Sequence, residues 1–120
     1  MAVDKKKTEA PKGAESTAYT FVTVCRSDEL PEGEVRQLKA RGKELAVGRL
    51  VGGQLFAVGG RCTHLRARLG KGTMNGTILA CPWHGAQFSV ENGEALAPPA
   101  PRSVSTYPVR VTGGFVEVEV

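Results

Sequence analysis

The chain lacks the long apolar run that a membrane-spanning helix needs. Its 120 residues contain no hydrophobic stretch close to the roughly 18 residues required. The lysines at 5–7 are not followed by the apolar segment of a signal peptide, and no pair of consecutive arginines marks a twin-arginine signal. We therefore expect a cytoplasmic protein with no membrane partner.

Cysteine, histidine and aromatic residues are also scarce. Three cysteines are too few and too odd in number for a disulfide framework. Cys25 falls in an alternating apolar run, so we expect a reduced thiol in the core or on an edge strand. Aromatic residues make up 6% of the chain, whereas glycine occurs 15 times and proline 7 times. This composition favours a turn-rich β protein over a helical one.

The first 18 residues carry almost no large apolar side chain. A segment of this kind cannot bury enough surface to offset the entropy of ordering, so residues 1–18 are predicted to form a disordered polar tail. The lysines at 5–7 are more consistent with a solubilising tail than with a nucleic-acid site, and we predict no nucleic-acid partner. The remaining residues, 19–120, are long enough for one domain.

From residue 19 onward, apolar and polar residues alternate with period two, which predicts an all-β domain. Gly52-Gly53 and Gly113-Gly114 are typical of hairpin turns. Short helical turns are expected only at 27–30 and in part of 65–69. The predicted strands are 19–25, 35–40, 44–51, 54–58, 77–80, 87–90, 106–111 and 115–120.

Two short boxes, Cys62-Thr63-His64 and Cys81-Pro82-Trp83-His84, are separated by sixteen residues. They contain both histidines and two of the three cysteines, and each box offers one thiolate and one imidazole to a metal. Both boxes are predicted on loops within residues 60–90, where they would hold a metal centre. A structural zinc ion could take these four ligands. However, common Cys2His2 zinc sites place both cysteines in one box, and a two-iron centre accepts one Cys and one His from each.

About a hundred residues, from 19 to the end, resemble the Rieske [2Fe–2S] ferredoxin family, in particular the soluble ferredoxin components of ring-hydroxylating dioxygenase systems. The resemblance is carried by Cys62-Thr63-His64-Leu65, by the second box with its continuation to Phe88, and by the proline-rich loop at 98–101. It implies an antiparallel β-sandwich or barrel with a small inserted cluster-binding subdomain of two loops.

The same resemblance implies one Rieske-type [2Fe–2S] cluster per chain. By this resemblance, Cys62 and Cys81 hold the inner iron, and His64 and His84 hold the outer, more exposed iron. Trp83 stands between two of these ligands, and we expect it to pack against the cluster and shield it from water rather than to serve as an electron conduit or a docking anchor.

Members of the family with a high potential have an additional disulfide between the two cluster loops, at positions occupied here by Ala67 and Trp83. They also direct two hydroxyl groups at the cluster sulfurs from positions that match Ala86 and Phe88. Hydrogen bonds to sulfur stabilise the reduced state. Their absence predicts a potential at the low end of the Rieske range, about −150 mV.

The first loop departs from the family pattern because Arg66 replaces a usual glycine. An arginine is strained in the left-handed backbone that glycine permits, so either the loop adjusts or its conformation accepts a side chain. Arg66, Arg68 and Lys71 would place positive charge around the outer histidines. We expect this basic rim to favour an acidic docking surface on a redox partner.

The function implied is that of a one-electron carrier, a component of an oxidoreductase system and not itself an enzyme. It would take electrons from a flavin reductase and pass them through the His64/His84 tip to an oxygenase or another terminal oxidoreductase. The alternative is a small Rieske-type subunit of an assimilatory nitrite reductase. An oxygenase itself would need a separate mononuclear iron site, and both histidines are already assigned to the cluster.

Overall fold

The computed structural model describes residues 21–64, 66–83, 85–97 and 102–120. Within these residues the strands form three antiparallel sheets, and the helical segments are two short 3-10 turns. No helix of the described residues is long and apolar enough to span a membrane. The predicted tail, 1–18, and the proline-rich loop at 98–101 lie outside the described residues.

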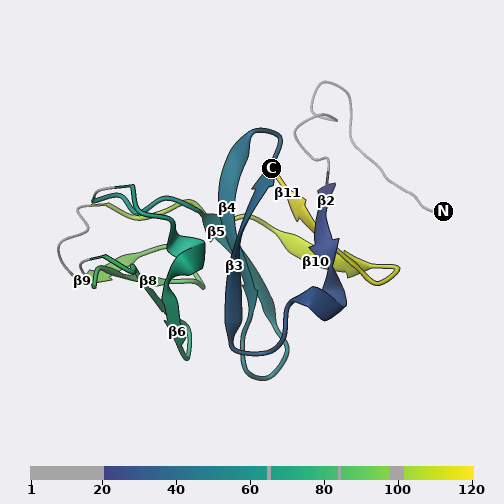
Figure 1. The fold of residues 1–120 in the computed structure, drawn as a ribbon, viewed down its shortest axis with the longest axis horizontal. Coiled ribbons are helices and arrows are strands. Elements are labelled where there is room, and N and C mark those ends of the chain that lie inside the picture. Colours follow the sequence, from purple (N-terminus) through teal and green to yellow (C-terminus); the bar gives the residue numbers. More distant parts are fainter. Residues whose placement is uncertain (1–20, 65, 84, 98–101) are drawn as a thin grey trace.

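The sheets are arranged along the long axis of the molecule (Figure 1). The first sheet has the order β10-β11-β2, the second β3-β4-β5 and the third β6-β7-β8-β9. Figure 1 shows the first and third sheets at opposite ends with the second between them. The bounds are β2 (Phe21–Arg26), β3 (Glu34–Ala40), β4 (Lys43–Arg49), β5 (Leu55–Gly59), β6 (Thr73–Asn75), β7 (Ile78–Ala80), β8 (Gln87–Ser89), β9 (Ala95–Ala97), β10 (Val109–Thr112) and β11 (Phe115–Glu119).

The middle sheet separates two hydrophobic cores. Successive side chains of a strand point to opposite faces, so β4 directs Leu45 and Val47 to one core and Ala46 to the other. In β5, Ala57 joins the first of these cores, and Phe56 joins the second. The core that contains Ala46 and Phe56 also contains Cys62 and Cys81. The cysteines of the two boxes therefore pack on the face of the middle sheet to which Ala46 and Phe56 point.

The all-β architecture predicted from the sequence is confirmed. Gly52 and Gly53 adopt left-handed φ angles of 109° and 100° in the turn between β4 and β5. The 3-10 turns η2 (Ser27–Glu29) and η3 (Leu69–Lys71) lie at or beside the expected helical turns. Strands β6 and β9 were not predicted, because each has only three residues and shows no clear alternation.

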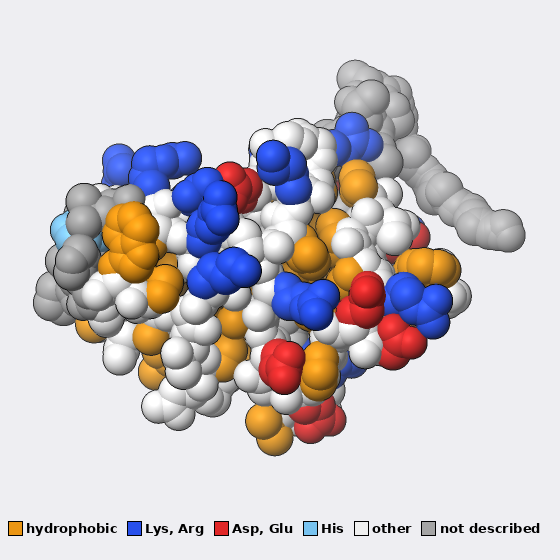
Figure 2. All heavy atoms as spheres, in the orientation of Figure 1, with side chains coloured by type: hydrophobic (Ala, Val, Ile, Leu, Met, Phe, Trp, Pro, Cys, Tyr) orange, Lys and Arg blue, Asp and Glu red, His pale blue; other side chains and the backbone are white. Residues whose placement is uncertain are grey.

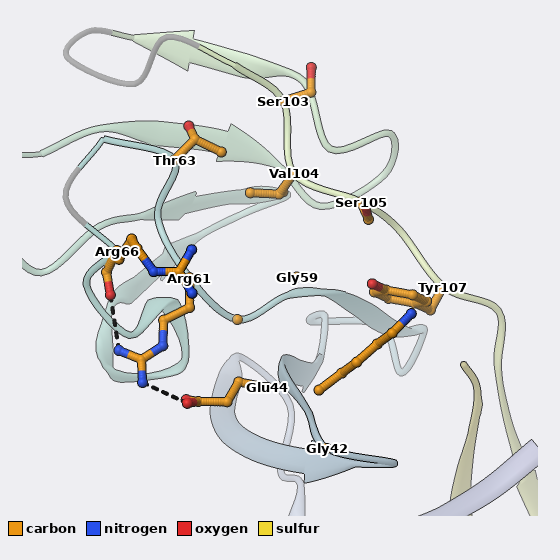
Figure 3. Close-up of a pocket in the computed structure, with 12 residues that line it drawn as sticks. Gly42, Glu44, Gly59, Arg61, Thr63, Arg66, Ser103, Val104, Ser105 and Tyr107 are labelled. Carbon is orange, nitrogen blue, oxygen red and sulfur yellow. Dashed lines mark hydrogen bonds and ion pairs between the residues drawn. The ribbon is translucent and has the colours of Figure 1, made fainter.

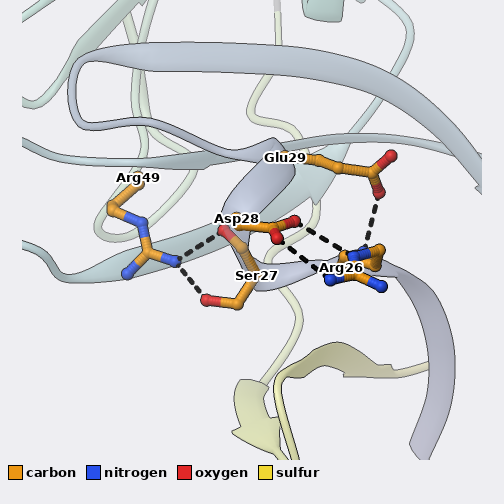
Figure 4. A network of polar contacts seen from close by, with 5 residues as sticks. All are labelled: Arg26, Ser27, Asp28, Glu29 and Arg49. Atoms are coloured by element: carbon orange, nitrogen blue, oxygen red, sulfur yellow. Dashed lines mark hydrogen bonds and ion pairs between the residues drawn. The ribbon is translucent and has the colours of Figure 1, made fainter.

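Arg49, at the end of β4, connects three segments of the chain through its guanidinium. Its Nε donates to the carbonyl of Leu30 (2.7 Å), Nη1 donates to the carbonyl of Gly53 (3.2 Å), and Nη2 donates to the Ser27 hydroxyl (2.7 Å). Figure 4 shows Arg49 directed at the η2 turn, on the opposite side from the ion pair between Arg26 and Asp28. Arg49 thus fixes the η2 turn to the middle sheet.

We predict that Arg49→Ala lowers the free energy of unfolding by about 2 kcal/mol, because the variant loses several hydrogen bonds and leaves the carbonyl of the buried Leu30 without its donor. Urea denaturation measures this change. Arg26→Ala removes an ion pair between two exposed side chains and should barely alter stability. Equal losses for the two variants would contradict a structural role for Arg49.

Candidate metal centre

The two boxes form loops of the same length and the same closure. In the first loop, the amide of Cys62 donates to the carbonyl of Ala67 (2.8 Å), and in the second, the amide of Cys81 donates to the carbonyl of Ala86 (2.7 Å). The first loop follows β5, and the second connects β7 to β8. Each cysteine therefore stands at the start of a six-residue loop that closes back onto it.

The fourth residue after each cysteine adopts a left-handed backbone. Gly85 has a φ of 77° in the second loop, and Arg66 has a φ of 61° in the first. The first loop therefore has the same left-handed conformation as the second, although its residue at this position is an arginine and not a glycine. This conformation costs a side-chain-bearing residue about 1–2 kcal/mol. The amide of Arg66 donates to the carbonyl of Cys62 (2.8 Å), which adds to the closure of the loop.

Both cysteines of the boxes are buried, with 1% of Cys62 and 6% of Cys81 exposed. They belong to one hydrophobic core, together with the two loop-closing alanines and Phe88. His64 is half-buried, and its amide donates to the Cys62 sulfur at 3.4 Å. Two buried thiols at equivalent loop positions, one with an amide donor, suit a cluster that needs thiolates inside and imidazoles outside.

The full ligand set stays a prediction. His84 lies outside the described residues, and so does Leu65. Among the residues that the structure does describe, no three His, Cys, Asp or Glu side chains gather closely enough to hold a metal ion. Of the four predicted ligands, the structure thus places the two cysteines in a common core and His64 beside Cys62.

Three of the residues from which a low potential was predicted are buried: Ala67, at a position of the absent disulfide, and Ala86 and Phe88, at the positions without a hydroxyl. Ala67, Ala86 and Phe88 are each at most 1% exposed. Trp83 is different, because 61% of it is exposed. Most of the Trp83 side chain thus faces solvent, and its contact with the cluster stays a prediction. The sequence could not show this, since a tryptophan between two ligands can face either the core or the surface.

Positive charge surrounds Trp83. Arg68 and Lys71 are exposed, and with Arg61, Pro82 and Trp83 they line one cleft. On the face shown in Figure 2, basic side chains gather at the left end beside a large hydrophobic side chain, and most acidic ones lie toward the right. The predicted basic rim is thus present around the loops, with Trp83 as an apolar element within it.

A second cleft, of about 430 Å³, lies between the β3–β4 turn, the first loop and residues 103–107. Figure 3 shows Arg61 at its wall, between the Glu44 carboxylate (2.6 Å from Nη2) and the backbone carbonyl of Arg66 (3.0 Å from Nη1). Hydrogen bonds from Gln37 and then from Arg61 lower the pKa of Glu44, so this carboxylate is ionised at neutral pH. Sequence reasoning assigned no role to Gln37 or Glu44, because strand pairing brings them to the loop.

Comparison with known proteins gives one consistent match. The model of the Rieske [2Fe–2S] domain family matches residues 20–108. The ferredoxin component of a naphthalene 1,2-dioxygenase system from Pseudomonas aeruginosa is 38% identical over 92 residues, covering 77% of this chain and 88% of that protein. The corresponding ferredoxin component from Pseudomonas putida is 40% identical over 104 residues, covering 87% and 98%.

Solved structures give the same result for the fold. A ferredoxin from Sphingomonas yanoikuyae B1 is 32% identical with a TM-score of 0.77, covering 84% of this chain and 99% of that one. A chain from the complex of reduced oxygenase and oxidised ferredoxin in carbazole 1,9a-dioxygenase is 33% identical (TM-score 0.75; 82% and 92% covered). A putative small subunit of an NADH-dependent nitrite reductase from Mycobacterium tuberculosis is 26% identical (TM-score 0.75; 83% and 94% covered).

Proposed function

Because the chain belongs to the Rieske [2Fe–2S] domain family, we propose that it is a ferredoxin that carries single electrons from a reductase to an oxygenase. Its cofactor is a Rieske [2Fe–2S] cluster, which supplies a one-electron redox couple when bound. The observation that carries the proposal is the pair of equal loops, each closed on a buried cysteine and each within the matched domain.

The residues proposed as ligands are Cys62 and Cys81 for the inner iron and His64 and His84 for the outer iron. Burial of the two cysteines supports their inner position, and the partial exposure of His64 supports an outer one. The amide of His64, which donates to the Cys62 sulfur, would stabilise the reduced state. Beyond that amide, the buried Ala86 and Phe88 add no hydroxyl donor, which supports a potential near the low end of the family.

The proposed partners are redox proteins. Relatives of this chain are ferredoxin components of dioxygenase systems, and one structural neighbour comes from a complex of oxygenase and ferredoxin. We propose an oxygenase as acceptor, a flavin reductase as donor, and docking at the His64/His84 tip through Arg66, Arg68 and Lys71. The exposure of these three basic side chains supports such docking. The cytoplasmic location stays a prediction.

A second candidate function is that of the small subunit of a nitrite reductase. Its support is the 26% identical neighbour, which is covered over 94% of its length. The two candidates share the fold and the cluster, so the genes beside this one discriminate better than the structure does. Genes for an oxygenase α-subunit and a flavin reductase would support the carrier, and a gene for a large sirohaem enzyme would support the subunit.

Purified protein tests the proposal directly. We expect red-brown protein whose reduced form gives the EPR spectrum of mixed nitrogen and sulfur ligation, with an average g value below that of four-cysteine clusters. A potential near the low end of the Rieske range, about −150 mV, is expected from protein-film voltammetry. A colourless protein containing one zinc ion would contradict the proposal, and a potential near +300 mV would contradict the assignment to the low-potential type.

A further inference from the structure

The first loop is held from outside by side chains of the middle sheet. Arg61, which precedes Cys62, donates from Nη1 to the carbonyl of Arg66 (3.0 Å) and from Nη2 to Glu44 on β4 (2.6 Å). Figure 3 shows both contacts made by the two ends of one guanidinium. A planar guanidinium can join a carboxylate and a carbonyl in this way, because its donors have a fixed geometry.

Gln37, on β3, extends this contact to both sides of the loop. Its Nε2 donates to the Glu44 carboxylate (2.9 Å) and to the carbonyl of Gly60 (2.9 Å). Its Oε1 accepts from the amide of Gly70 (2.7 Å). One side chain thus binds the backbone before the loop and the backbone after it. The carboxylate of Glu44 receives hydrogen bonds from both Gln37 and Arg61.

The packing around Gln37 is too close for other residue types. A Cβ added at Gly60 would clash with the Gln37 amide, and one added at Gly70 would clash with the backbone of Gln37. The backbone of β3 therefore packs directly against the flank after the first loop, and the backbone of β4 at Glu44 and Leu45 packs against the flank before it. Because the contact is this close, the hydrogen-bonded side chains of Gln37, Glu44 and Arg61 lie within reach of backbone groups of the loop and its flanks.

The two cluster loops differ in the residue at the left-handed position, and this difference explains why only the first loop needs support from the middle sheet. At the left-handed position the second loop has Gly85, which adopts the conformation at no steric cost, and the first loop has Arg66. Among the described residues, the carbonyl of Arg66 accepts a side-chain hydrogen bond and that of Gly85 does not. We infer that Gln37, Glu44 and Arg61 are positioning residues that hold Arg66 in the left-handed conformation and so keep the first loop in shape for its ligands.

The inference rests on the proposed function only in that the first loop carries two ligands. Its test compares Arg61→Lys with Arg110→Lys. Arg110 forms an ion pair with Glu117 (2.7 Å) on the β10–β11 hairpin, at the other end of the molecule, and provides a matched control. A lysine keeps the charge at position 61 but cannot bind Glu44 and the Arg66 carbonyl in the same fork.

We expect Arg61→Lys to release iron to a chelator about tenfold faster than the parent protein, and Arg110→Lys to release it at the parental rate. Hydrogen exchange followed by mass spectrometry should show faster exchange in the peptide spanning 60–70, with β10 and β11 unchanged. Far-UV circular dichroism and urea denaturation establish that both variants are folded. Equal iron release and equal exchange in the two variants would overturn the inference.

A second variant addresses the reason for the contact. Arg66→Gly removes the steric cost of the left-handed backbone, so adding Arg61→Lys to it should change iron release by less than about threefold. If Arg61→Lys keeps its full effect in the Arg66→Gly background, the role assigned to these residues is refuted. Exchange at 60–70 can also be measured in metal-free protein. A loop effect there supports the inference even if the proposed cluster and function prove incorrect.

Discussion

Replacing Cys81 by serine is expected to give a colourless protein without a Rieske EPR spectrum. Cys81 is almost completely buried, closes its loop through its own amide, and shares a core with Cys62. A serine hydroxyl at this position is a much poorer ligand for iron than a thiolate. His64→Ala should likewise abolish the spectrum, because it removes an imidazole from the outer iron. Iron and sulfide analysis with EPR of the reduced protein measures both losses.

Cys25 provides the matched control for the cysteine substitution. It lies on the edge strand β2, at the other end of the molecule, and packs against the other core. Burial raises the pKa of this thiol, and Glu29 raises it further, so it stays protonated at neutral pH and is a poor metal ligand. Cys25→Ser should keep full colour and an unchanged EPR spectrum. An intact Rieske spectrum in Cys81→Ser would refute the ligand role of Cys81.

The sequence predicted those parts of the structure that leave a periodic or compositional signal. Strand-like patterns of five to seven residues identified β3, β4 and β5, although β4 and β5 contribute side chains from both faces to the two cores. The two boxes predicted the loops because their ligand types are rare in this chain. Strands β6 and β9 have three residues each, too few to show a period. Local pattern therefore predicted the fold class and the two loops, but not the whole third sheet.

The parts that the sequence could not predict depend on contacts between distant residues. The exposure of the Trp83 side chain is one such feature, because no local pattern distinguishes a tryptophan that faces solvent from one that is buried. The sequence left open whether the backbone at Arg66 is left-handed or the loop adjusts, and the structure shows the left-handed backbone that Gly85 has in the second loop. Gln37 and Glu44 reach the first loop because β3 and β4 pair in one particular register. Their side chains resemble ordinary solvent-facing strand residues in the sequence.

Reversing the charge of the basic rim should have the second largest effect, this time on the rate of electron transfer. Arg68 and Lys71 are exposed on the cleft beside Trp83 and form no ion pair with a described residue. In the variant Arg68→Glu/Lys71→Glu, we expect oxidation of the reduced protein by ferricyanide, an anionic acceptor, to slow by about ten- to a hundredfold at low ionic strength. Oxidation by hexaamminecobalt(III), a cationic acceptor, should become faster. Stopped-flow absorbance measures both rates.

The control variant, Arg26→Glu/Arg110→Glu, changes the net charge by the same amount on the far sheet, where both arginines are exposed. If electrons leave near the first and second loops, only the charges close to that exit govern the approach of the acceptor, and the control should differ little from the parent protein. Differences among the three proteins should disappear at high salt, because the Debye length falls to about 3 Å at 1 M. Equal slowing in both variants would show that net charge acts instead of the basic rim, and would contradict docking at Arg68 and Lys71. If the basic rim does govern docking, an acceptor protein that docks through acidic residues should oxidise the three proteins in the same order of rates as ferricyanide does.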